Sequence, residues 1–356
     1  MNSTKHPIVR AIDVGYGNTK YVASHTHGQP IVCSLFPSLA PQAAATGDLG
    51  SGVFARRNTV PILIKGVRYE VGRDSELAQD ASYGRVLDGD YSMSDTYLAL
   101  LRGALHYMAQ PVIDMLVLGL PVNYYDQFAE RLAERMTGAH TIPDFRADDP
   151  TTARPIEVLV KHVRVVPQPI GAFLDYSTGN GSYDRMRSQL NLLIDPGYFT
   201  VDWVVSKGVK MVNSRSGSHS GGMSSILRQI ADQLAPVIGA PLSDLSELDS
   251  ALRDGRNPHF FGQEFTGWSE FVAMGREKAR QSMQVLAAKV GNGVDIQNII
   301  LAGGGAEFFL DVVREKFPKH NVTVAKNPVF ANVRGFQLAG TQFMQQAAVE
   351  AQRAPK

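Results

Sequence analysis

The sequence Asp13-Val-Gly-Tyr16, near the start of the chain, is nearly repeated as Asp195-Pro-Gly-Tyr198 just past its middle. Each copy lies between two strand-like runs, residues 8–12 and 19–24 for the first and residues 190–194 and 200–206 for the second. The pattern predicts two strand–turn–strand hairpins, each with an Asp at the end of its first strand. Such a turn presents backbone N–H groups to an anion, and its carboxylate can hold a hydrated cation. Two copies half a chain apart favour a duplicated architecture that clamps a magnesium–polyphosphate.

Length and composition agree with two domains. The chain has 356 residues, 44% of them hydrophobic and 19% charged, which is enough to bury a sizeable core. A net charge of +1 argues against a strongly cationic nucleic-acid-binding surface. The single Cys33 excludes a disulfide framework and a cysteine zinc site, and it indicates a reducing compartment. Because no apolar run resembles a signal peptide or a membrane span, we expect a cytoplasmic protein without membrane contact.

Strands and helices alternate in both halves, which predicts an α/β architecture. Residues 112–120 form a near-continuous apolar run, typical of a central strand buried on both faces. Residues 144–155 are polar and proline-rich and are expected to form a loop. Helices are expected at residues 95–108, 124–137, 223–234, 243–253, 271–290 and 308–317, and from residue 331 onward.

Gly303, Gly304 and Gly305 follow the expected strand 298–301 and precede a helix. Three glycines allow a flat ligand to approach the backbone, and the N–H groups of a helix start favour a phosphate. The alternative is an ordinary tight strand-to-helix turn. The segment has neither the G-x-G-x-x-G spacing of a dinucleotide fold nor that of a P-loop, so neither of these classes is supported.

Five segments together resemble the actin, heat-shock chaperone and sugar-kinase superfamily. They occur in the family order: residues 13–20 resemble its first phosphate loop, 166–172 its first connecting helix, 193–202 its second phosphate loop, 300–307 its adenosine motif and 330–335 its second connecting helix. Within the superfamily, the sequence is most similar to bacterial plasmid-segregation actins of the ParM/StbA type. The form found as protein D of PRTRC plasmid gene clusters is nearest.

The resemblance implies an actin-like (ribonuclease H-like) duplicated α/β fold of two lobes with a nucleotide cleft between them. Domain I would span residues 1–165 and domain II residues 166–335, with residues 336–356 packing back onto domain I. The implied cofactors are ATP (or GTP) and Mg²⁺.

Roles for individual residues follow from the same resemblance. Asp13 and Asp195 would hold Mg²⁺ through water, and Gln168 would orient the attacking water with Asp195 as the nearest carboxylate. The residues that would contact phosphate are Gly15, Tyr16, Gly17, Asn18 and Lys20 in the first loop and Gly197, Tyr198, Phe199 and Thr200 in the second. The residues that would contact the adenosine are Gly221, Gly222, Lys278, Gly303, Gly304 and Gly305. Asp202 is interpreted as structural.

Three positions depart from the family pattern. Tyr16 stands where actins often carry a hydroxyl that meets the γ-phosphate, and Pro196 replaces a Gly and removes one N–H donor. Gln168 stands where segregation actins of the best-known type often have Glu. These changes concern hydrolysis and the phosphate contacts rather than nucleotide binding itself.

The resemblance implies an ATPase that polymerises on binding ATP and moves plasmid DNA through a DNA-binding adaptor, without binding nucleic acid directly. Three alternatives remain open from the sequence. They are a small-molecule kinase of the same superfamily, a chaperone-type nucleotide switch, and a non-polymerising scaffold that binds ATP.

Overall fold

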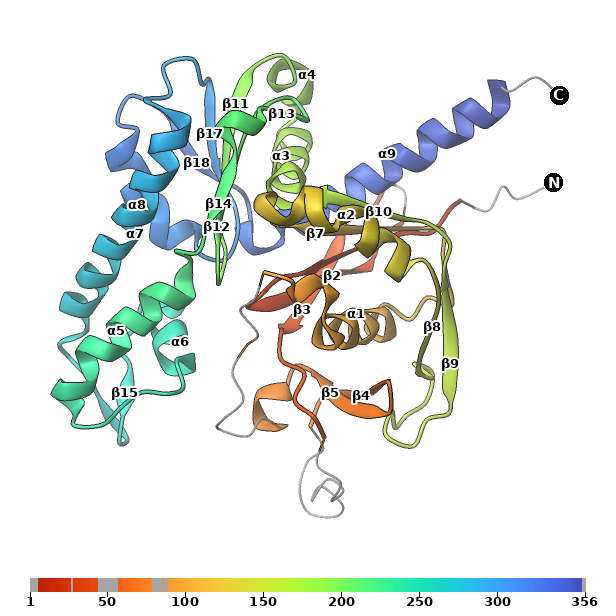
Figure 1. Ribbon diagram of the computed structural model, residues 1–356, viewed down its shortest axis with the longest axis horizontal. Helices are drawn as coiled ribbons and strands as arrows, with labels where there is room; N and C mark the ends of the chain where they lie inside the picture. Colours follow the sequence, from red (N-terminus) through yellow and green to blue (C-terminus); the bar gives the residue numbers. More distant parts are fainter. Residues whose placement is uncertain (1–5, 27, 44–56, 79–84, 86–88, 354–356) are drawn as a thin grey trace. The chain divides into compact units, whose positions relative to one another are not determined.

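The computed structural model describes residues 6–26, 28–43, 57–78, 85 and 89–353. The chain divides into two compact units, one formed by Met1–Gly181 with Phe330–Lys356 and the other by Ser182–Val329 (Figure 1). Each unit is an α/β domain, as the alternation of strands and helices predicts.

The main sheet of the first unit has the strand order β3–β2–β1–β7–β10. Its strands are β1 (Val9–Val14), β2 (Asn18–Ser24), β3 (Val32–Pro37), β7 (Met115–Leu120) and β10 (Val163–Pro167). The first three strands are antiparallel, whereas β1, β7 and β10 run parallel. All six residues of β1 and of β7 are buried, which explains why these strands are nearly continuous apolar runs.

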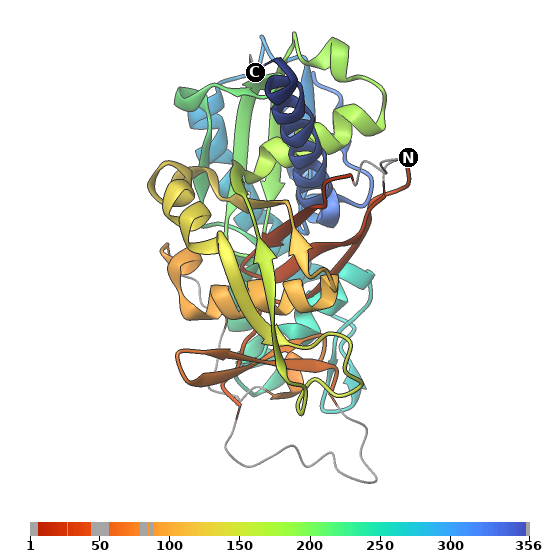
Figure 2. The same ribbon diagram turned by 90° about the vertical axis from the view of Figure 1, so that its right-hand side faces the viewer.

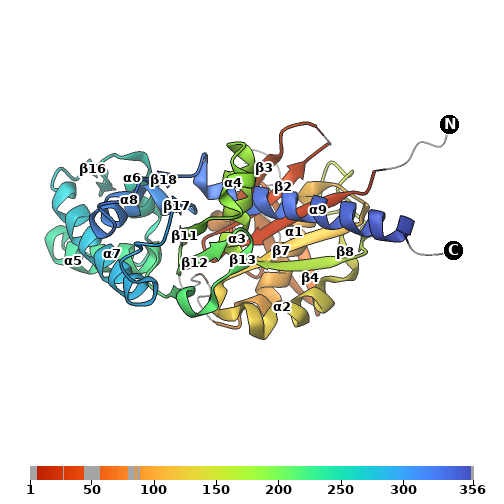
Figure 3. The same ribbon diagram turned by 90° about the horizontal axis from the view of Figure 1, so that it is seen from above.

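Helices cover both faces of this sheet. They are α1 (Asp95–Met108), α2 (Val122–Met136), α3 (Gln168–Gly179) and α9 (Ala331–Arg353). Helix α1 packs between the main sheet and the hairpin of β4 (Thr59–Ile64) and β5 (Val67–Gly72) (Figure 2). Helix α9 lies along the opposite face, over β1 and β7 (Figure 3). Asp114 interrupts the single strand predicted at 112–120: β6 (Val112–Ile113) joins β8 (Gly138–Pro143) and β9 (Pro155–Val160) in a separate sheet, while β7 pairs with β1.

The main sheet of the second unit has the order β13–β12–β11–β17–β18, with the short β14 (Gly217–His219) added to β12. Its strands are β11 (Leu190–Pro196), β12 (Val201–Lys207), β13 (Lys210–Met211), β17 (Asn298–Leu301) and β18 (Val322–Val324). The helices of this unit are α4 (Tyr183–Met186), α5 (Met223–Ile238), α6 (Ser246–Asp254), α7 (Trp268–Val290) and α8 (Ala306–Lys316). A hairpin of β15 (His259–Phe260) and β16 (Gln263–Glu264) precedes α7.

The two main sheets have the same topology. In each, the first three strands form an antiparallel meander, one later strand pairs in parallel with the first strand, and a final strand pairs in parallel with that later strand. Strand β1 therefore corresponds to β11, and the hairpin β1–β2 corresponds to β11–β12. This correspondence accounts for the repeated Asp-x-Gly-Tyr sequence at the end of β1 and β11.

Helices α3 and α9 cross at a pair of glycines in the first unit. A Cβ atom at Gly335 would lie 1.8 Å from the carbonyl oxygen of Gly171, so only glycine fits. Beside the crossing, the Arg334 guanidinium donates two hydrogen bonds to the Asp175 carboxylate at 2.7 and 2.6 Å. The boundaries of the compact units differ from the predicted 165/166 and 335/336, because α3 and the start of α9 pack against each other within the first unit.

We expect Gly335→Ala to destabilise the first unit by about 1–3 kcal/mol, because the added methyl group overlaps a backbone carbonyl that cannot rotate away. Gly179→Ala at the end of α3 is the matched control, because its Cβ would meet nothing within 4 Å. Urea unfolding of both variants measures the difference. Equal midpoints would show that the two helices separate at little cost.

Candidate functional site

The turns that follow β1 and β11 have the same backbone geometry. In the first, the N–H of Gly15 donates to the carbonyl of Asn18 at 3.2 Å, and in the second, the N–H of Gly197 donates to the carbonyl of Thr200 at 2.8 Å. The strand register is also equivalent, because each Asp lies opposite the seventh residue after it. Asp13 pairs with Lys20, and Asp195 pairs with Asp202. The duplicated motif is therefore a duplicated structure.

The first turn holds its carboxylate between two donors. Asp13 is 1% exposed, and its Oδ2 forms an ion pair with Lys20 Nζ at 2.9 Å. Its Oδ1 accepts a hydrogen bond from Gln168 Nε2, at the start of α3, at 2.8 Å. The structure thus brings together three of the predicted site residues and directs the Lys20 charge at Asp13.

Ser38, just after β3, fixes the shape of this turn. Its N–H donates to the Gly17 carbonyl at 3.0 Å, and its hydroxyl donates to the Gly15 carbonyl at 2.5 Å. The Thr19 hydroxyl lies 2.9 Å from the Ser38 hydroxyl. Nothing in the local sequence around Ser38 indicated this role, because the contact depends on the pairing of β2 with β3.

Tyr16 belongs to an aromatic cluster. Its ring stacks on Tyr91 at a centroid distance of 5.0 Å, and Tyr91 meets Tyr97 edge to face. Tyr91 and Tyr97 are buried, and burial raises the pKa of both phenols. The Tyr16 ring thus packs against the core of the first unit.

The start of α5 fixes the second turn. The N–H groups of Met223 and Ser224 donate to the carbonyls of Gly197 and Tyr198 at 3.0 and 2.7 Å, and the N–H of Gly222 donates to Phe199 at 3.0 Å. A Cβ at Gly222 would lie 2.7 Å from the Gly197 carbonyl oxygen, so glycine is required for this close approach.

Two buried carboxylates lie opposite each other across β11 and β12. Asp195 is 6% and Asp202 is 2% exposed, and Asp202 accepts a hydrogen bond from the Thr200 hydroxyl at 2.6 Å. Gly303 packs directly on Asp195: its φ is +82°, and a Cβ there would lie 1.9 Å from Asp195 Oδ1. Asp202, interpreted from the sequence as structural, therefore belongs to the same polar site as Asp195.

Gly221 lies between β14 and α7. The Ser282 hydroxyl donates to the Gly221 carbonyl at 3.1 Å, and a Cβ at Gly221 would overlap Ser282 and His219. Lys278 is one helical turn before Ser282. Partial burial and the nearby Lys278 charge lower the pKa of His219.

A cavity of about 600 Å³ opens beside Gly304 in the second unit. Gly304 is exposed, and a Cβ there would meet nothing within 4 Å. The side chains around it come from the starts of α5, α7 and α8 and from α6, among them Met223, Arg276, Glu307 and Phe308. Arg276, although exposed, lines this cavity, whereas Lys278 lies near His219.

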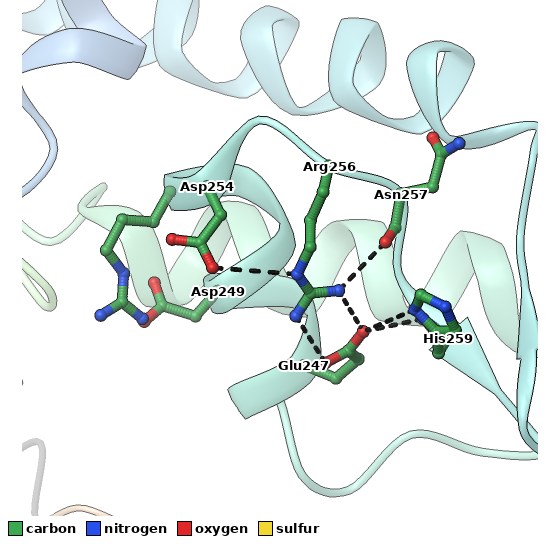
Figure 4. Close-up of polar contacts among 7 residues, drawn as sticks. Glu247, Asp249, Asp254, Arg256, Asn257 and His259 are labelled. Atoms are coloured by element: carbon green, nitrogen blue, oxygen red, sulfur yellow. Dashed lines mark hydrogen bonds and ion pairs between the residues drawn. The ribbon is translucent and has the colours of Figure 1, made fainter.

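Arg256, which lines this cavity, belongs to an ion-pair network (Figure 4). Arg256 donates two hydrogen bonds to Glu247 at 2.6 and 2.9 Å, and one to the Asn257 carbonyl at 3.0 Å. The same carboxylate accepts the backbone N–H of His259 at 2.7 Å. The Arg256 hydrogen bonds lower the pKa of Glu247 to about 2, so the pair remains ionised well into the acidic range.

Other chemistries find little support among the described residues. No group of three or more His, Cys, Asp and Glu side chains in this part of the chain is placed to hold a metal ion. No helix within the described ranges is both long and apolar enough to span a membrane. Burial raises the pKa of the Cys33 thiol to about 12, which removes its nucleophilic character near neutral pH.

Comparisons with known proteins identify the family. Residues 11–171 match the family of the N-terminal domain of actin-like proteins, and residues 193–315 match the C-terminal domain of archaeal, MreB-like actin homologues. Both domains are actin-like. This agrees with the predicted two-domain α/β fold and with the identical topology of the two sheets. No curated protein sequence matches the chain.

Solved structures show the same actin-like fold. A ParM in a 15-stranded filament from Clostridium botulinum is 20% identical, with a TM-score of 0.74 over 95% of this chain and all of the other. A non-polymerisable quadruple mutant of pCBH ParM is 19% identical, with a TM-score of 0.72 and the same coverage. An archaeal actin homologue in complex with ADP is 20% identical, with a TM-score of 0.71 over 94% of this chain and 99% of the other. The closer similarity to the PRTRC protein stays a prediction.

We expect Gly303→Ala to destabilise the second unit by about 2–4 kcal/mol, because alanine is strained at a positive φ and its methyl group would overlap the Asp195 carboxylate. The adjacent Gly304→Ala is the matched control and should change stability by less than about 1 kcal/mol. Thermal unfolding compares the two. A stable Gly303→Ala protein would show that Asp195 can leave its position freely.

Proposed function

We propose that this chain is an ATPase that binds Mg-ATP with the phosphate loops of both actin-like domains. The observation that carries the proposal is the duplicated turn, with a buried carboxylate at the same position in each domain. The phosphate contacts would come from the backbone of residues 15–18 and 197–200, which is held in a fixed shape by Ser38 and by the start of α5. The relative whose structure contains ADP supports a nucleotide as ligand.

The second domain offers the better fit for Mg²⁺. Asp195 and Asp202 are both buried and lie opposite each other, and Mg²⁺ in phosphate sites prefers one or two carboxylates together with water and phosphate oxygens. Asp13 already has its charge balanced by Lys20, so it would act on the metal through water. When bound, the ion would neutralise charge on the phosphates during transfer to water.

The cavity beside Gly304 fits the adenosine. It lies in the same domain as the second phosphate loop, and Gly305 connects the two by donating its N–H to the Pro196 carbonyl at 2.8 Å. Arg276 and Phe308 give the cavity a cationic and an aromatic wall suited to a base.

Gln168 would orient the attacking water. Its amide is held on Asp13, so the side chain is positioned before the nucleotide binds. Because an amide is no general base, hydrolysis by this arrangement would be slow and would depend on positioning and on Mg²⁺.

Both site residues can be tested through turnover. We expect Asp195→Asn and Gln168→Ala to reduce Mg-dependent phosphate release tenfold or more, about 1.4 kcal/mol of barrier each, while adenosine affinity changes little. Asp184→Asn, at a side chain 93% exposed, is the control. Steady-state phosphate release and binding of a fluorescent ADP in the absence of Mg²⁺ give the two readouts. Equal loss of binding and turnover in folded protein would contradict these roles.

Self-association into filaments is the second part of the proposal. The relative from Clostridium botulinum forms a filament. In this chain, two large apolar side chains are more exposed than any others among the described residues, and they lie near opposite ends of α7. Phe261, 81% exposed, lies at the tip of the β15–β16 hairpin before α7. Val294, 83% exposed, lines a groove of about 1080 Å³ after it.

The charges of the two ends are complementary. Residues 244–270 contain six carboxylates and two arginines: Asp244, Glu247, Asp249, Asp254, Glu264, Glu270, Arg253 and Arg256. The groove is lined by Lys316 and Lys319 and by no carboxylate of the described residues, and Asp295, next to Val294 in the sequence, is paired with Arg215 at 2.6 Å. A contact between two different ends of the same domain is head-to-tail, and repetition of such a contact gives an open filament.

We expect the protein to sediment with ATP and a non-hydrolysable analogue, and to remain soluble with ADP. Phe261→Asn should raise the concentration needed for assembly about tenfold or more without changing nucleotide binding, because it removes an exposed ring. Asn also suits the φ of +53° at this position, so the variant should fold. Leu63→Asn, at an exposed residue of the first unit, is the control.

A monomeric protein with ATP at tens of micromolar would contradict filament formation. Transfer of the γ-phosphate from ATP to an added acceptor, without assembly, would favour a small-molecule kinase, and a screen of phosphate acceptors would reveal it. ATP binding without turnover would favour a scaffold.

Plasmid segregation through a DNA-binding adaptor is the cellular role that we propose for such filaments, and it is supported by the similarity to ParM structures. Loss of a host plasmid after deletion of the gene, with rescue by the wild-type chain and not by Phe261→Asn, is the test.

A further inference from the structure

A second cavity, of about 390 Å³, lies in the first unit at the opposite end of β1 from the phosphate loop. Its walls are the start of β1, the residues that follow β2, and one side of α9. Most of the lining is apolar, from Pro7, Ile8, Val9, Met344 and Ala348. Among the residues that the structure describes, no carboxylate lines it, and Arg10 is its one permanently charged side chain.

Arg10 is a buried cation without an acidic partner among the described residues. It is 7% exposed, and within the described part of the chain the one hydrogen bond of its side chain runs from Nη1 to the neighbouring Val9 carbonyl at 2.8 Å. Its Nε has no hydrogen-bond partner. A buried guanidinium of this kind costs several kcal/mol unless an anion balances it, so the position is unfavourable for the protein alone.

The surroundings do not supply the missing charge. Asp114 accepts a hydrogen bond from the N–H of Ile8, one of the residues that line the cavity, at 2.7 Å. Its charge is balanced by an ion pair with Lys161 at 2.7 Å. Gln337 of α9, 1% exposed, donates to the same Val9 carbonyl as Arg10, at 3.1 Å, so that the two polar groups converge on one point of the cavity wall.

We propose that this cavity binds a small organic carboxylate with an apolar tail, held by Arg10. The carboxylate would accept the remaining Arg10 N–H groups in a charge-assisted pair, and the tail would lie against Met344 and the start of β1. The volume falls within the range of about 300–1,000 Å³ that is usual for small-molecule pockets. The proposal is independent of nucleotide binding, since none of the phosphate-loop residues lines the cavity.

The test uses the full chain and octanoate as the probe, with octanol, octylamine and inorganic phosphate as comparisons. At octanoate tenfold above its dissociation constant, the unfolding temperature should rise by about 3–6 °C. Arg10→Met should abolish this shift, whereas Arg154→Met, at an exposed arginine of the same unit, should retain it. Without any ligand, Arg10→Met should be at least as stable as the wild type, because the variant removes an unbalanced buried charge.

A second measurement does not depend on a variant. In protein with ¹³C-labelled methionine methyl groups, octanoate should shift the Met344 signal and leave Met211 of the second unit unchanged. ADP should not compete with octanoate. Equal protection by octanol, retention of the shift in Arg10→Met, protection by phosphate alone, or no response of Met344 at millimolar octanoate would each overturn the proposal.

Discussion

The glycine pair Gly171–Gly335 is the constraint on which the architecture of the first unit depends. The chain leaves this unit after α3 and returns to it at the start of α9, and the two helices meet with their backbones in contact. The Asp175–Arg334 pair, 15% and 17% exposed, adds a second fixed point one turn away. Because the start of α3 also carries Gln168, the same packing that fixes the crossing determines where the Gln168 amide meets Asp13.

The two β-hairpins have the same backbone structure but differ in the charges of their side chains. The two hairpins share their topology, turn hydrogen bond and strand register, yet the residue opposite the repeated Asp is Lys20 in one unit and Asp202 in the other. In the first unit the buried carboxylate is therefore balanced by a built-in cation. In the second, two buried carboxylates face each other, an arrangement that becomes favourable when a divalent cation binds. The same hairpin structure thus carries a different charge arrangement in each unit.

The hairpins, the α/β class and most helices could be predicted from the sequence, because these follow from local periodicity and turn residues. The break at Asp114 could not, since it depends on β6 and β7 joining different sheets. In the same way, Ser38 and Arg276 reach the site through tertiary packing that no local pattern records. The glycines at 222 and 303 could be identified as important, but only the structure shows that they make room for the Phe199 turn and the Asp195 carboxylate.

Strand β1 carries two ionisable side chains, Arg10 and Asp13, and all six of its residues are buried. Burial penalises both charges alike, but the structure compensates only one of them: Asp13 has Lys20 and Gln168, whereas Arg10 has a backbone carbonyl. An apolar residue at position 10 would avoid this cost and would suit a central strand. Since the guanidinium borders a cavity that no acid of the described residues lines, an entering anion would offset this cost, and this is the difference that we expect between a binding site and a structural arginine.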